Sequence, residues 1–333
     1  MQGRLENELK IQRATEKIVD NLPQFVNEWY INMKASRKTA SSCQDFVIKI
    51  RKFLEYVNYD VKEIKPTDIT LSVCESYMIA CQTKKNENGM IVYTSDSYQK
   101  GNWSAINSLL SFLEKRKYIS YNHMKDIVRP KNHDADRINN ERVWLTNNDF
   151  RKILNTVKKG NPYMDGVFTY RDISILLLLM TTGMRCSALT SINIQDIDYK
   201  KNTLSIIDKG SKIHIYPLSD EIISYIRKWV RDREKIASPY TDAMFVNNKG
   251  ERISSKGISN LVVDTCEQAI GKRLSPHKLR SGFCSILYEK THDIEFVRRA
   301  VGHSNVKTTQ RYIKTDGKER EKASQIMGDI LKI

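Results

Sequence analysis

The sequence predicts a mainly α-helical protein with a small β-hairpin, which places it in the α+β class. In segment 41–57 the apolar residues fall at positions i, i+4, i+7 and i+8, the spacing of one helix face. Residues 173–180 are apolar except for Ser174, which indicates a buried helix. Two alternating segments flank Lys209-Gly-Ser-Lys212, and alternation around a glycine turn is typical of a hairpin.

The first part of the chain is expected to hold four helices. The second and fourth have their apolar residues on one face, and the third follows the start signal Pro66-Thr-Asp68. Residues 1–17 are charged and are interpreted as an N-terminal tail or a short helix. The four helices are expected at about residues 22–33, 41–57, 71–81 and 97–115.

The helical pattern lapses between residues 122 and 142. The polar, proline-containing run Arg129–Arg137 is typical of an exposed linker between domains. The sequence therefore predicts a tail over 1–17, a helical domain over 18–121, a linker over 122–142, a second domain over 143–320 and a C-terminal helix over 321–333.

The second domain opens with the helix-start signal Leu145-Thr-Asn-Asn-Asp149, which predicts a helix over 150–157. The buried helix over 171–180 follows, and Gly183 is expected to end it. After the hairpin, helices are expected at about residues 220–237, 255–270, 275–290, 293–300 and from 308 onward.

Charge and composition narrow the range of functions. The 333 residues include 55 Lys and Arg against 39 Asp and Glu, a net charge of +16, which favours a polyanionic partner such as nucleic acid or an anionic membrane surface. No apolar run approaches the roughly 20 residues of a membrane span, and the charged N-terminus does not resemble a signal peptide. The 6 cysteines are scattered without a CxxC pair, which argues against disulfides and favours a reducing cytoplasm. A nucleic-acid partner would place the protein at the nucleoid.

The segment Ser275-Pro-His277-Lys-Leu-Arg280 predicts a basic site at the start of a helix. Serine followed by proline is a helix-opening pair, and His277 and Arg280, at i and i+3, share one face. Imidazole, guanidinium and the N–H groups of a helix start together suit a phosphate. Taken alone, the segment fits a capped surface helix equally well.

Three further segments carry related chemistry. Arg185 follows the buried helix and the glycine that ends it, so its position is rigid. The planar guanidinium of an arginine at such a position suits a bidentate contact with a phosphate. Lys209, in the hairpin turn, can donate a proton to a leaving oxygen. Tyr312 lies nine residues after His303, and a phenol that nearby cations draw toward phenolate can attack phosphorus. Taken alone, each residue fits a structural role better: a surface arginine, a polar turn and a half-buried tyrosine.

In this order and spacing, the segments resemble those of the tyrosine recombinase (phage integrase) family, in an Xer-like or mobile-element form. The resemblance covers about residues 144–320. Its most specific blocks are Thr182–Ile192, Asp208-Lys-Gly-Ser-Lys212, Pro276–Arg280 and Gly302–Lys314.

The resemblance implies that Tyr312 attacks the scissile phosphate of DNA and forms a 3′-phosphotyrosine, leaving a free 5′-hydroxyl. Arg185 and Arg280 would clamp the non-bridging oxygens. His277 and His303 would bind the same phosphate or assist proton transfer. Lys209 would protonate the departing 5′-oxygen. No metal, ATP or other cofactor is implied, because cationic side chains stabilise the transferred charge.

The resemblance also implies an architecture, in which a helical core-binding domain and the catalytic domain close as a C-shaped clamp on duplex DNA. Strand exchange between two recombination sites implies a homotetramer, and accessory DNA-bending or directionality factors are further expected partners. The C-terminal helix over 321–333 is expected to dock on a neighbouring protomer. About 17 residues precede the first helix, too few for an arm-binding domain, which favours an Xer-like or transposon enzyme over a phage or conjugative-element integrase.

Some side chains are expected to contact DNA without taking part in cleavage. The helix over 97–115 carries basic and aromatic residues that suit a major groove. The expected DNA contacts are Tyr98, Lys100, Asn102, Lys212 and Lys278.

One residue departs from the family pattern. Ala188 stands three positions after Arg185, where the family commonly has an acidic residue. The missing carboxylate is expected to affect the packing around Arg185 and not the chemistry. Lys209 is preferred over Lys212 because it lies at the strand end, and Cys186 is interpreted as a packing residue. The histidines without metal-ligand spacing are His123, His133, His214 and His292.

The alternative function is a non-catalytic, sequence-specific DNA-binding protein. Such a protein would have no need of Tyr312 at its spacing from His303. A type IB topoisomerase shares the chemistry but not this layout, and an RNA-binding protein is disfavoured because no stacking motif is evident.

Overall fold

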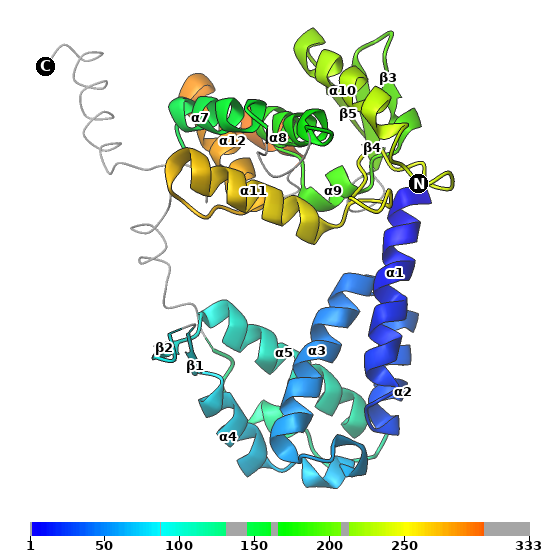
Figure 1. Cartoon of the computed structure of the whole chain (residues 1–333). Coiled ribbons are helices and arrows are strands. Elements are labelled where there is room, and N and C mark those ends of the chain that lie inside the picture. Colours follow the sequence, from blue (N-terminus) through cyan, green and yellow to red (C-terminus); the bar gives the residue numbers. More distant parts are fainter. Residues whose placement is uncertain (1, 87, 131–144, 161–165, 208–212, 303–333) are drawn as a thin grey trace, which may run out of the picture. The chain divides into compact units, whose positions relative to one another are not determined.

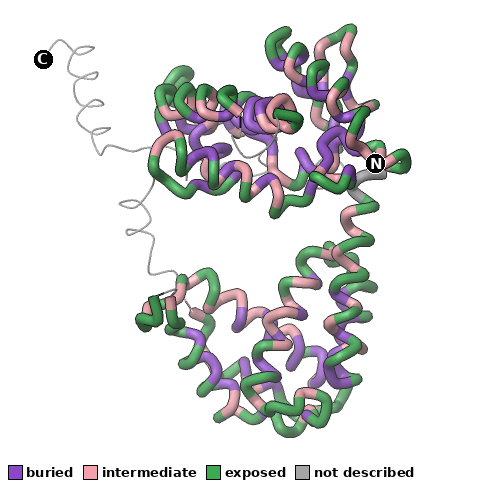
Figure 2. The backbone as a smooth tube through the Cα atoms, viewed as in Figure 1, coloured by how far each residue is buried: buried purple, intermediate pink, exposed green. Residues whose placement is uncertain are grey.

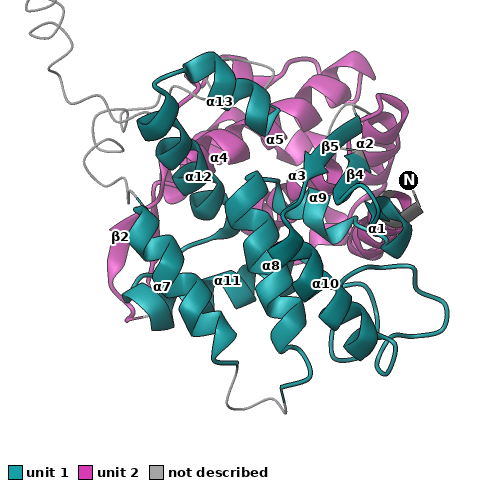
Figure 3. Cartoon of the chain, turned by 90° about the horizontal axis from the view of Figure 1, so that it is seen from above, with its two compact units in different colours: residues 1, 143–333 teal, residues 2–142 magenta. Residues whose placement is uncertain are grey.

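The computed structural model describes residues 2–86, 88–130, 145–160, 166–207 and 213–302. The chain divides into two compact units, an N-terminal unit of residues 2–142 and a C-terminal unit of residues 143–333 (Figure 3). Each unit buries a hydrophobic core of its own, visible in Figure 2 as the purple segments inside each group of helices.

The described part of the N-terminal unit is built mainly from α-helices (Figure 1). Thr39, Thr70 and Ser95 each cap a helix, because their side-chain oxygens accept the backbone N–H three residues on. Trp29 and Phe53 are among the largest side chains in the core. The elements are α1 (Gln2–Val19), α2 (Gln24–Ala35), α3 (Ala40–Val57), η1 (Val61–Glu63), η2 (Pro66–Asp68), α4 (Leu71–Ala80), β1 (Thr83–Lys85), β2 (Ile91–Tyr93), α5 (Asp96–Lys115) and η3 (His123–Lys125).

The charged N-terminal segment is a helix, which agrees with the short-helix alternative for residues 1–17 and excludes the tail. Helix α1 packs against α3. Thr15 and Val19 are buried, and the Thr15 hydroxyl donates to the carbonyl of Ile11 at 2.8 Å. Charged residues are abundant in α1, so the sequence shows little of the apolar pattern by which the helix packs.

The expected linker begins too early at residue 122. Asn122 and Met124 are fully buried. The indole N–H of Trp103 donates to the carbonyl of Ile127 at 3.0 Å. These contacts anchor the start of the expected linker in the N-terminal core, and its remainder over 131–142 lies outside the described residues.

The described part of the C-terminal unit surrounds one central helix, α8, with helices α7, α10 and α12 packed against it. The elements are α7 (Asn147–Lys158), α8 (Thr169–Thr182), α9 (Cys186–Thr190), η4 (Ile194–Asp196), β3 (Ile197–Asp198), β4 (Thr203–Ile207), β5 (Ile213–Pro217), α10 (Asp220–Arg233), α11 (Ser255–Ile270), α12 (Pro276–Thr291) and α13 (Ile294–Val301).

Helix α8 forms where the apolar run predicts it and is buried over residues 173–180. Gly183 ends it in the left-handed conformation, with φ at +59°. A Cβ at this position would lie 2.5 Å from the ring of Phe283 on α12, so the turn also requires glycine for space.

The start signal of the second domain forms a capping box. The Thr146 hydroxyl accepts the Asp149 N–H at 3.2 Å, and the Asp149 carboxylate accepts the Thr146 N–H at 2.8 Å. Helix α7 therefore begins three residues before its expected start at residue 150.

The predicted hairpin strands are β4 and β5, which pair antiparallel from Thr203 opposite Pro217 to Ile207 opposite Ile213. The turn between them, residues 208–212, lies outside the described residues. Strand β3 extends this sheet on the β4 side, and β1 and β2 form a second small sheet. Neither addition was expected, because β1, β2 and β3 are too short to show alternation.

The remaining described helices agree with the sequence in position, except that α10 ends at Arg233, four residues before its expected end. The helices expected from 308 onward and over 321–333 lie outside the described residues. The predicted class, mainly α with small antiparallel sheets, is confirmed. Within the described ranges, no helix is long and apolar enough to cross a membrane.

Candidate active site in the C-terminal unit

Arg185 lies at a turn that is fixed at both ends. It is half-buried at the N-cap position of α9, two residues after the glycine that ends α8. At the far end of α9, Nη1 of Arg252 donates to the carbonyls of Thr190 at 3.0 Å and Ile192 at 3.1 Å. Nη2 of Arg252 donates to Oδ1 of Asn193 at 2.7 Å. These bonds place a cation on the last carbonyls of the helix that carries Arg185.

Arg280 joins three elements of the unit. Its side chain projects from α12 and is only 3% exposed. Nη1 donates to the carbonyl of Gly183, at the end of α8, and Nη2 donates to the carbonyl of Val301, at the end of α13, at 2.8 Å. A guanidinium carries five donors, so this geometry uses part of its hydrogen-bonding capacity to hold the two turns.

His277 lies in the first turn of α12, one residue after Pro276. Ser275 occupies the N-cap position as predicted, but its hydroxyl makes no capping bond; instead its carbonyl accepts the N–H of Lys278 at 2.8 Å. His277 lies at the surface, yet the surrounding protein excludes enough water to lower the pKa of the imidazole below 6.5. The positive charges of Arg280, Lys278 and Arg185 lower this pKa further.

Hydrogen bonding brings the two arginines together, because Arg280, one turn after His277 on α12, donates to the carbonyl of Gly183, two residues before Arg185. These residues come from two elements that are separated by nearly a hundred positions in the sequence. Several cationic donors around one neutral imidazole form a site for an anion with several oxygens.

Four residues of the predicted site lie outside the described residues: Lys209, Lys212, His303 and Tyr312. The described chain resumes on both sides of the hairpin turn, and it ends at Gly302, one residue before His303. Ile207 and Ile213 close the paired part of the hairpin, and Gly302 caps α13 in the left-handed conformation, with φ at +66°.

One of the expected DNA contacts is wrong. Asn102 is fully buried, its side-chain amide donates to the carbonyl of Tyr98 at 2.9 Å, and its Oδ1 accepts the hydroxyl of Tyr77 at 3.4 Å. Asn102 shares the buried face of α5 with Ile106 and Leu109. Tyr98 is 37% exposed, while Lys100 and Lys278 are half-buried.

Cys186 and Ala188, which follow Arg185 in the sequence, are packing residues. Ala188 is buried in the main core of the unit, which leaves no room for a solvated carboxylate at its position. Burial raises the pKa of the Cys186 thiol, which donates to the carbonyl of Ser255 at 3.8 Å. A thiol with a raised pKa is a poor nucleophile, which supports the packing interpretation of Cys186.

Two supporting residues were missed by sequence reasoning. Arg252 stands among ordinary loop residues, and His214 was considered only as a metal ligand. The alternation in β5 places His214 and Tyr216 on the same face, but it does not reveal that the His214 ring lies against Gly302.

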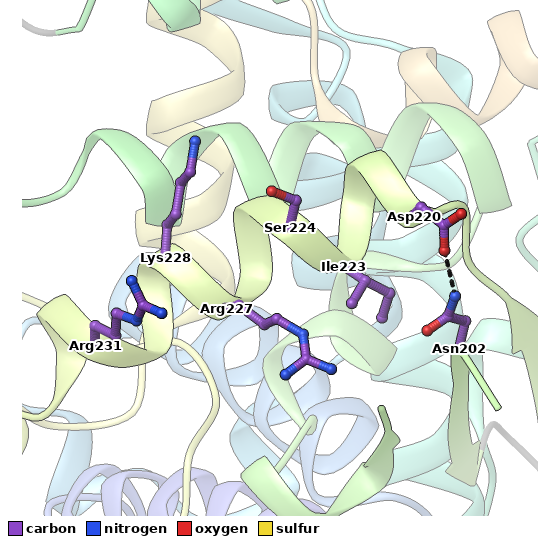
Figure 4. A pocket seen from close by; sticks show the side chains of 7 residues that line it. All are labelled: Asn202, Asp220, Ile223, Ser224, Arg227, Lys228 and Arg231. Atoms are coloured by element: carbon purple, nitrogen blue, oxygen red, sulfur yellow. Dashed lines mark hydrogen bonds between the residues drawn. The ribbon is translucent and has the colours of Figure 1, made fainter. Parts of the chain in front are cut away.

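A pocket of about 360 Å³ lies along α10 and contains none of the predicted site residues (Figure 4). Oδ1 of Asp220 accepts a hydrogen bond from Nδ2 of Asn202 at 2.6 Å at one end of the pocket. Over the described ranges, no group of three His, Cys, Asp or Glu residues could hold a metal ion. The pocket is lined by Asn202, Asp220, Ile223, Ser224, Arg227, Lys228 and Arg231.

Comparison with known sequences identifies the family. The model of the phage integrase family matches residues 143–319, more than half of the chain. Tyrosine recombinase XerC of Pseudomonas fluorescens is 28% identical over 254 residues, which cover 74% of this chain and 82% of that protein. XerC of Pseudomonas syringae pv. syringae is 33% identical over 152 residues, covering 46% of this chain and 50% of that protein.

Solved structures support the fold. The XerH site-specific recombinase bound to its difH substrate has a TM-score of 0.65 at 22% identity, with 88% of this chain and 81% of that chain covered. A lambda integrase dimer bound to a COC′ core site has a TM-score of 0.61 at 16% identity, with 89% and 96% covered. The chain therefore belongs to the phage integrase family, the tyrosine recombinases, and is a site-specific recombination enzyme.

Proposed function

We propose that the protein cleaves and rejoins duplex DNA at specific sites with Tyr312 as the nucleophile. The phenolic oxygen of Tyr312 forms a bond to the scissile phosphorus while the bond to the 5′-oxygen breaks. The products are a 3′-phosphotyrosine and a 5′-hydroxyl. Because the phosphodiester energy is kept in the adduct, a 5′-hydroxyl from a second duplex can reverse the step without ATP.

In this reaction Arg185 and Arg280 bind the non-bridging oxygens and stabilise the pentacoordinate phosphorus. His277 and His303 bind the same phosphate or assist proton transfer, and Lys209 protonates the leaving 5′-oxygen. One observation carries the proposal: the buried guanidinium of Arg280 donates to the carbonyl of Gly183, two residues before Arg185, and to the carbonyl of Val301, two residues before His303. A site of this kind is prepared for a phosphate before DNA arrives.

The DNA partner is inferred from two further observations. The net charge of +16 favours a polyanion. The neighbouring structures include recombinases bound to DNA, among them the Tn1549 transposon integrase in complex with a circular intermediate DNA, with a TM-score of 0.59. We expect Tyr98, Lys100, Lys212 and Lys278 to contact the DNA and the two units to close around it as a clamp.

Strand exchange between two sites involves four cleavages, so the assembly on DNA is proposed to be a homotetramer. The C-terminal segment over 321–333 is proposed to dock on a neighbouring protomer. Deleting residues 322–333 should then preserve binding to one duplex and abolish recombination. Unchanged recombination would refute the docking role. The biological setting is proposed to be an Xer-like resolution system or a mobile element, acting with accessory DNA-bending or directionality factors.

Covalent trapping tests this function. Wild type and Tyr312→Phe are incubated in EDTA with a randomised library of nicked duplexes, to which DNA flanking the gene is added. SDS-resistant adducts are then isolated and their DNA is sequenced. An adduct with wild type alone supports tyrosine catalysis without a metal and reveals the site. Tight duplex binding without any adduct would favour the alternative, a DNA-binding protein that lacks catalysis.

A further inference from the structure

The end of α13 rests on a histidine ring from the small sheet. Gly302 follows α13 with φ at +66°, and a Cβ built on it would lie 2.6 Å from Cε1 of His214. The two other ring atoms nearest to that point lie at 3.2 and 3.4 Å, so the ring covers the bare Cα of the glycine. Gly302 is therefore required both for its backbone conformation and for the space that the His214 ring occupies.

The His214 ring is itself supported by the main core. It stacks on Tyr216, with ring centroids 6.2 Å apart and an interplanar angle of 24°. Tyr216 is buried in the large core of the C-terminal unit. Both side chains lie on the inner face of β5, because alternate residues of a strand share a face, whereas Ile213 and Ile215 are exposed on the other.

Among the described residues, helix α13 has few other contacts with the unit. It packs mainly on α12, through a small cluster of Cys284, Val297 and Val301 that is separate from the main core. The His214 ring thus joins the end of α13 to the sheet. The residue before Gly302 is Val301, whose carbonyl accepts the hydrogen bond from Nη2 of Arg280 at 2.8 Å.

We infer that His214 is a positioning residue for Arg280. The His214 ring fixes Gly302, Gly302 fixes the carbonyl of Val301, and that carbonyl holds one arm of the guanidinium. The inference rests on the proposed function, in which Arg280 binds the scissile phosphate. His214 acts by the shape of its ring, so another flat ring should replace it. It is not expected to contact DNA.

Hydrogen exchange on the free protein tests the packing step without any substrate. The full chain is prepared as wild type, His214→Ala, His214→Phe and the control Ile215→Ala, which trims an exposed side chain from the opposite face of the same strand. In His214→Ala, amides of α13 should exchange at least 10-fold faster than in wild type. His214→Phe should restore most of the protection, and Ile215→Ala should leave it unchanged. Equal protection of α13 in wild type and His214→Ala would overturn the inference.

Single-turnover cleavage then tests the positioning step. The probe is a nicked duplex recovered by trapping with the wild-type protein. We expect His214→Ala to bind it within about twofold of wild type and to form adduct 10- to 100-fold more slowly, since a displacement of about 1 Å can cost 100-fold in rate. His214→Phe should recover most of the rate. Wild-type cleavage by His214→Ala would refute the positioning role alone, whereas failure of the wild type to form an adduct in the preceding trapping step would refute the proposed function.

Discussion

Nη2 of Arg280 donates to the carbonyl of Val301 at 2.8 Å, from a side chain that is 3% exposed. The other arm of the same guanidinium donates to the carbonyl of Gly183. One buried cation therefore holds the turn before Arg185 and the turn before His303, two residues upstream of each. In the proposed reaction the same side chain binds phosphate, so assembly of the site and stabilisation of the transition state depend on one residue.

Replacing Arg280 with lysine should damage both roles. An ammonium cannot span two carbonyls as a planar fork does. We expect Arg280→Lys to lose about 2 kcal/mol in the free energy of unfolding, since charged hydrogen bonds contribute about 1.5–3 kcal/mol each. Adduct formation should fall by about 100-fold or more. The control is Arg273→Lys, at an exposed ion pair with Glu267. Denaturant unfolding and adduct formation measure the two effects, and a normal rate in Arg280→Lys would exclude the clamp role.

The two left-handed helix caps allow a matched test of the ring contact. Gly271 and Gly302 have φ angles of +67° and +66°, but a Cβ at Gly271 would meet nothing within 4 Å. Gly271→Ala should therefore cost only about 1–2 kcal/mol of backbone strain. Gly302→Ala should cost about 1–3 kcal/mol more, because the new methyl displaces the His214 ring.

A double-mutant cycle checks the cause of this difference. His214→Ala should relieve part of the extra cost when it is combined with Gly302→Ala, giving a coupling of about 1 kcal/mol in urea unfolding. Equal losses for Gly271→Ala and Gly302→Ala would show that the ring does not press on Gly302.

Arg252 is expected to act on Arg185 through α9. Arg252→Gln removes the donors to the carbonyls of Thr190 and Ile192, so we expect a loss of about 1–3 kcal/mol in stability. Adduct formation should slow while binding of an uncleaved duplex changes little. Parallel rate and binding measurements distinguish this outcome from a loss of DNA affinity. Equal weakening of rate and affinity would mean that Arg252 supports binding and not the geometry of Arg185.

The histidine in the basic cluster should give a defined pH dependence. Partial burial and then the charges of Arg280, Lys278 and Arg185 lower the pKa of His277 from its ordinary value of 6.5. The unfolded chain therefore takes up this proton more readily than the folded one. The corresponding stability is present above pH 6.5 and is lost as the pH falls through the folded pKa. His277→Gln should remove this part of the pH dependence.

NMR titration of the imidazole measures the shift directly, with His277→Gln assigning the signal. The midpoint in the free protein should lie below 6.5 and should rise when a duplex is bound, because a phosphate favours the charged imidazole. A free-protein midpoint at or above 6.5 would contradict the clustering of positive charge around His277.

Much of the fold could be predicted because the relevant signals are local. The apolar run of α8, the Thr146 and Asp149 capping box and the alternation in β4 and β5 all lie within single elements. For residues 1–17 the many charges left a tail and a short helix both open, and α1 is the helix. The buried start of the expected linker was missed because few apolar positions hold it. Asn102 was placed on the wrong side of α5, since a polar residue in a helix does not itself reveal a buried hydrogen bond.

The candidate site could be predicted only in part. Arg185, His277 and Arg280 were proposed from the order of the motifs, which carries information about chemistry. Their supports could not be found this way, because each is a contact between distant segments: Arg252 with the end of α9, and His214 with Gly302. The two carbonyls that hold Arg280 belong to the backbone, and the sequence does not show which donor a carbonyl will meet.

The most direct test of covalent catalysis is to identify the amino acid that carries the DNA. The trapped wild-type adduct is digested with nuclease and protease, and the peptide that retains a nucleotide is sequenced by mass spectrometry. Attachment of the 3′-phosphate to the Tyr312 oxygen is the predicted result. Attachment to any other side chain, or an adduct that persists in Tyr312→Phe, would contradict the assignment of Tyr312 as the nucleophile.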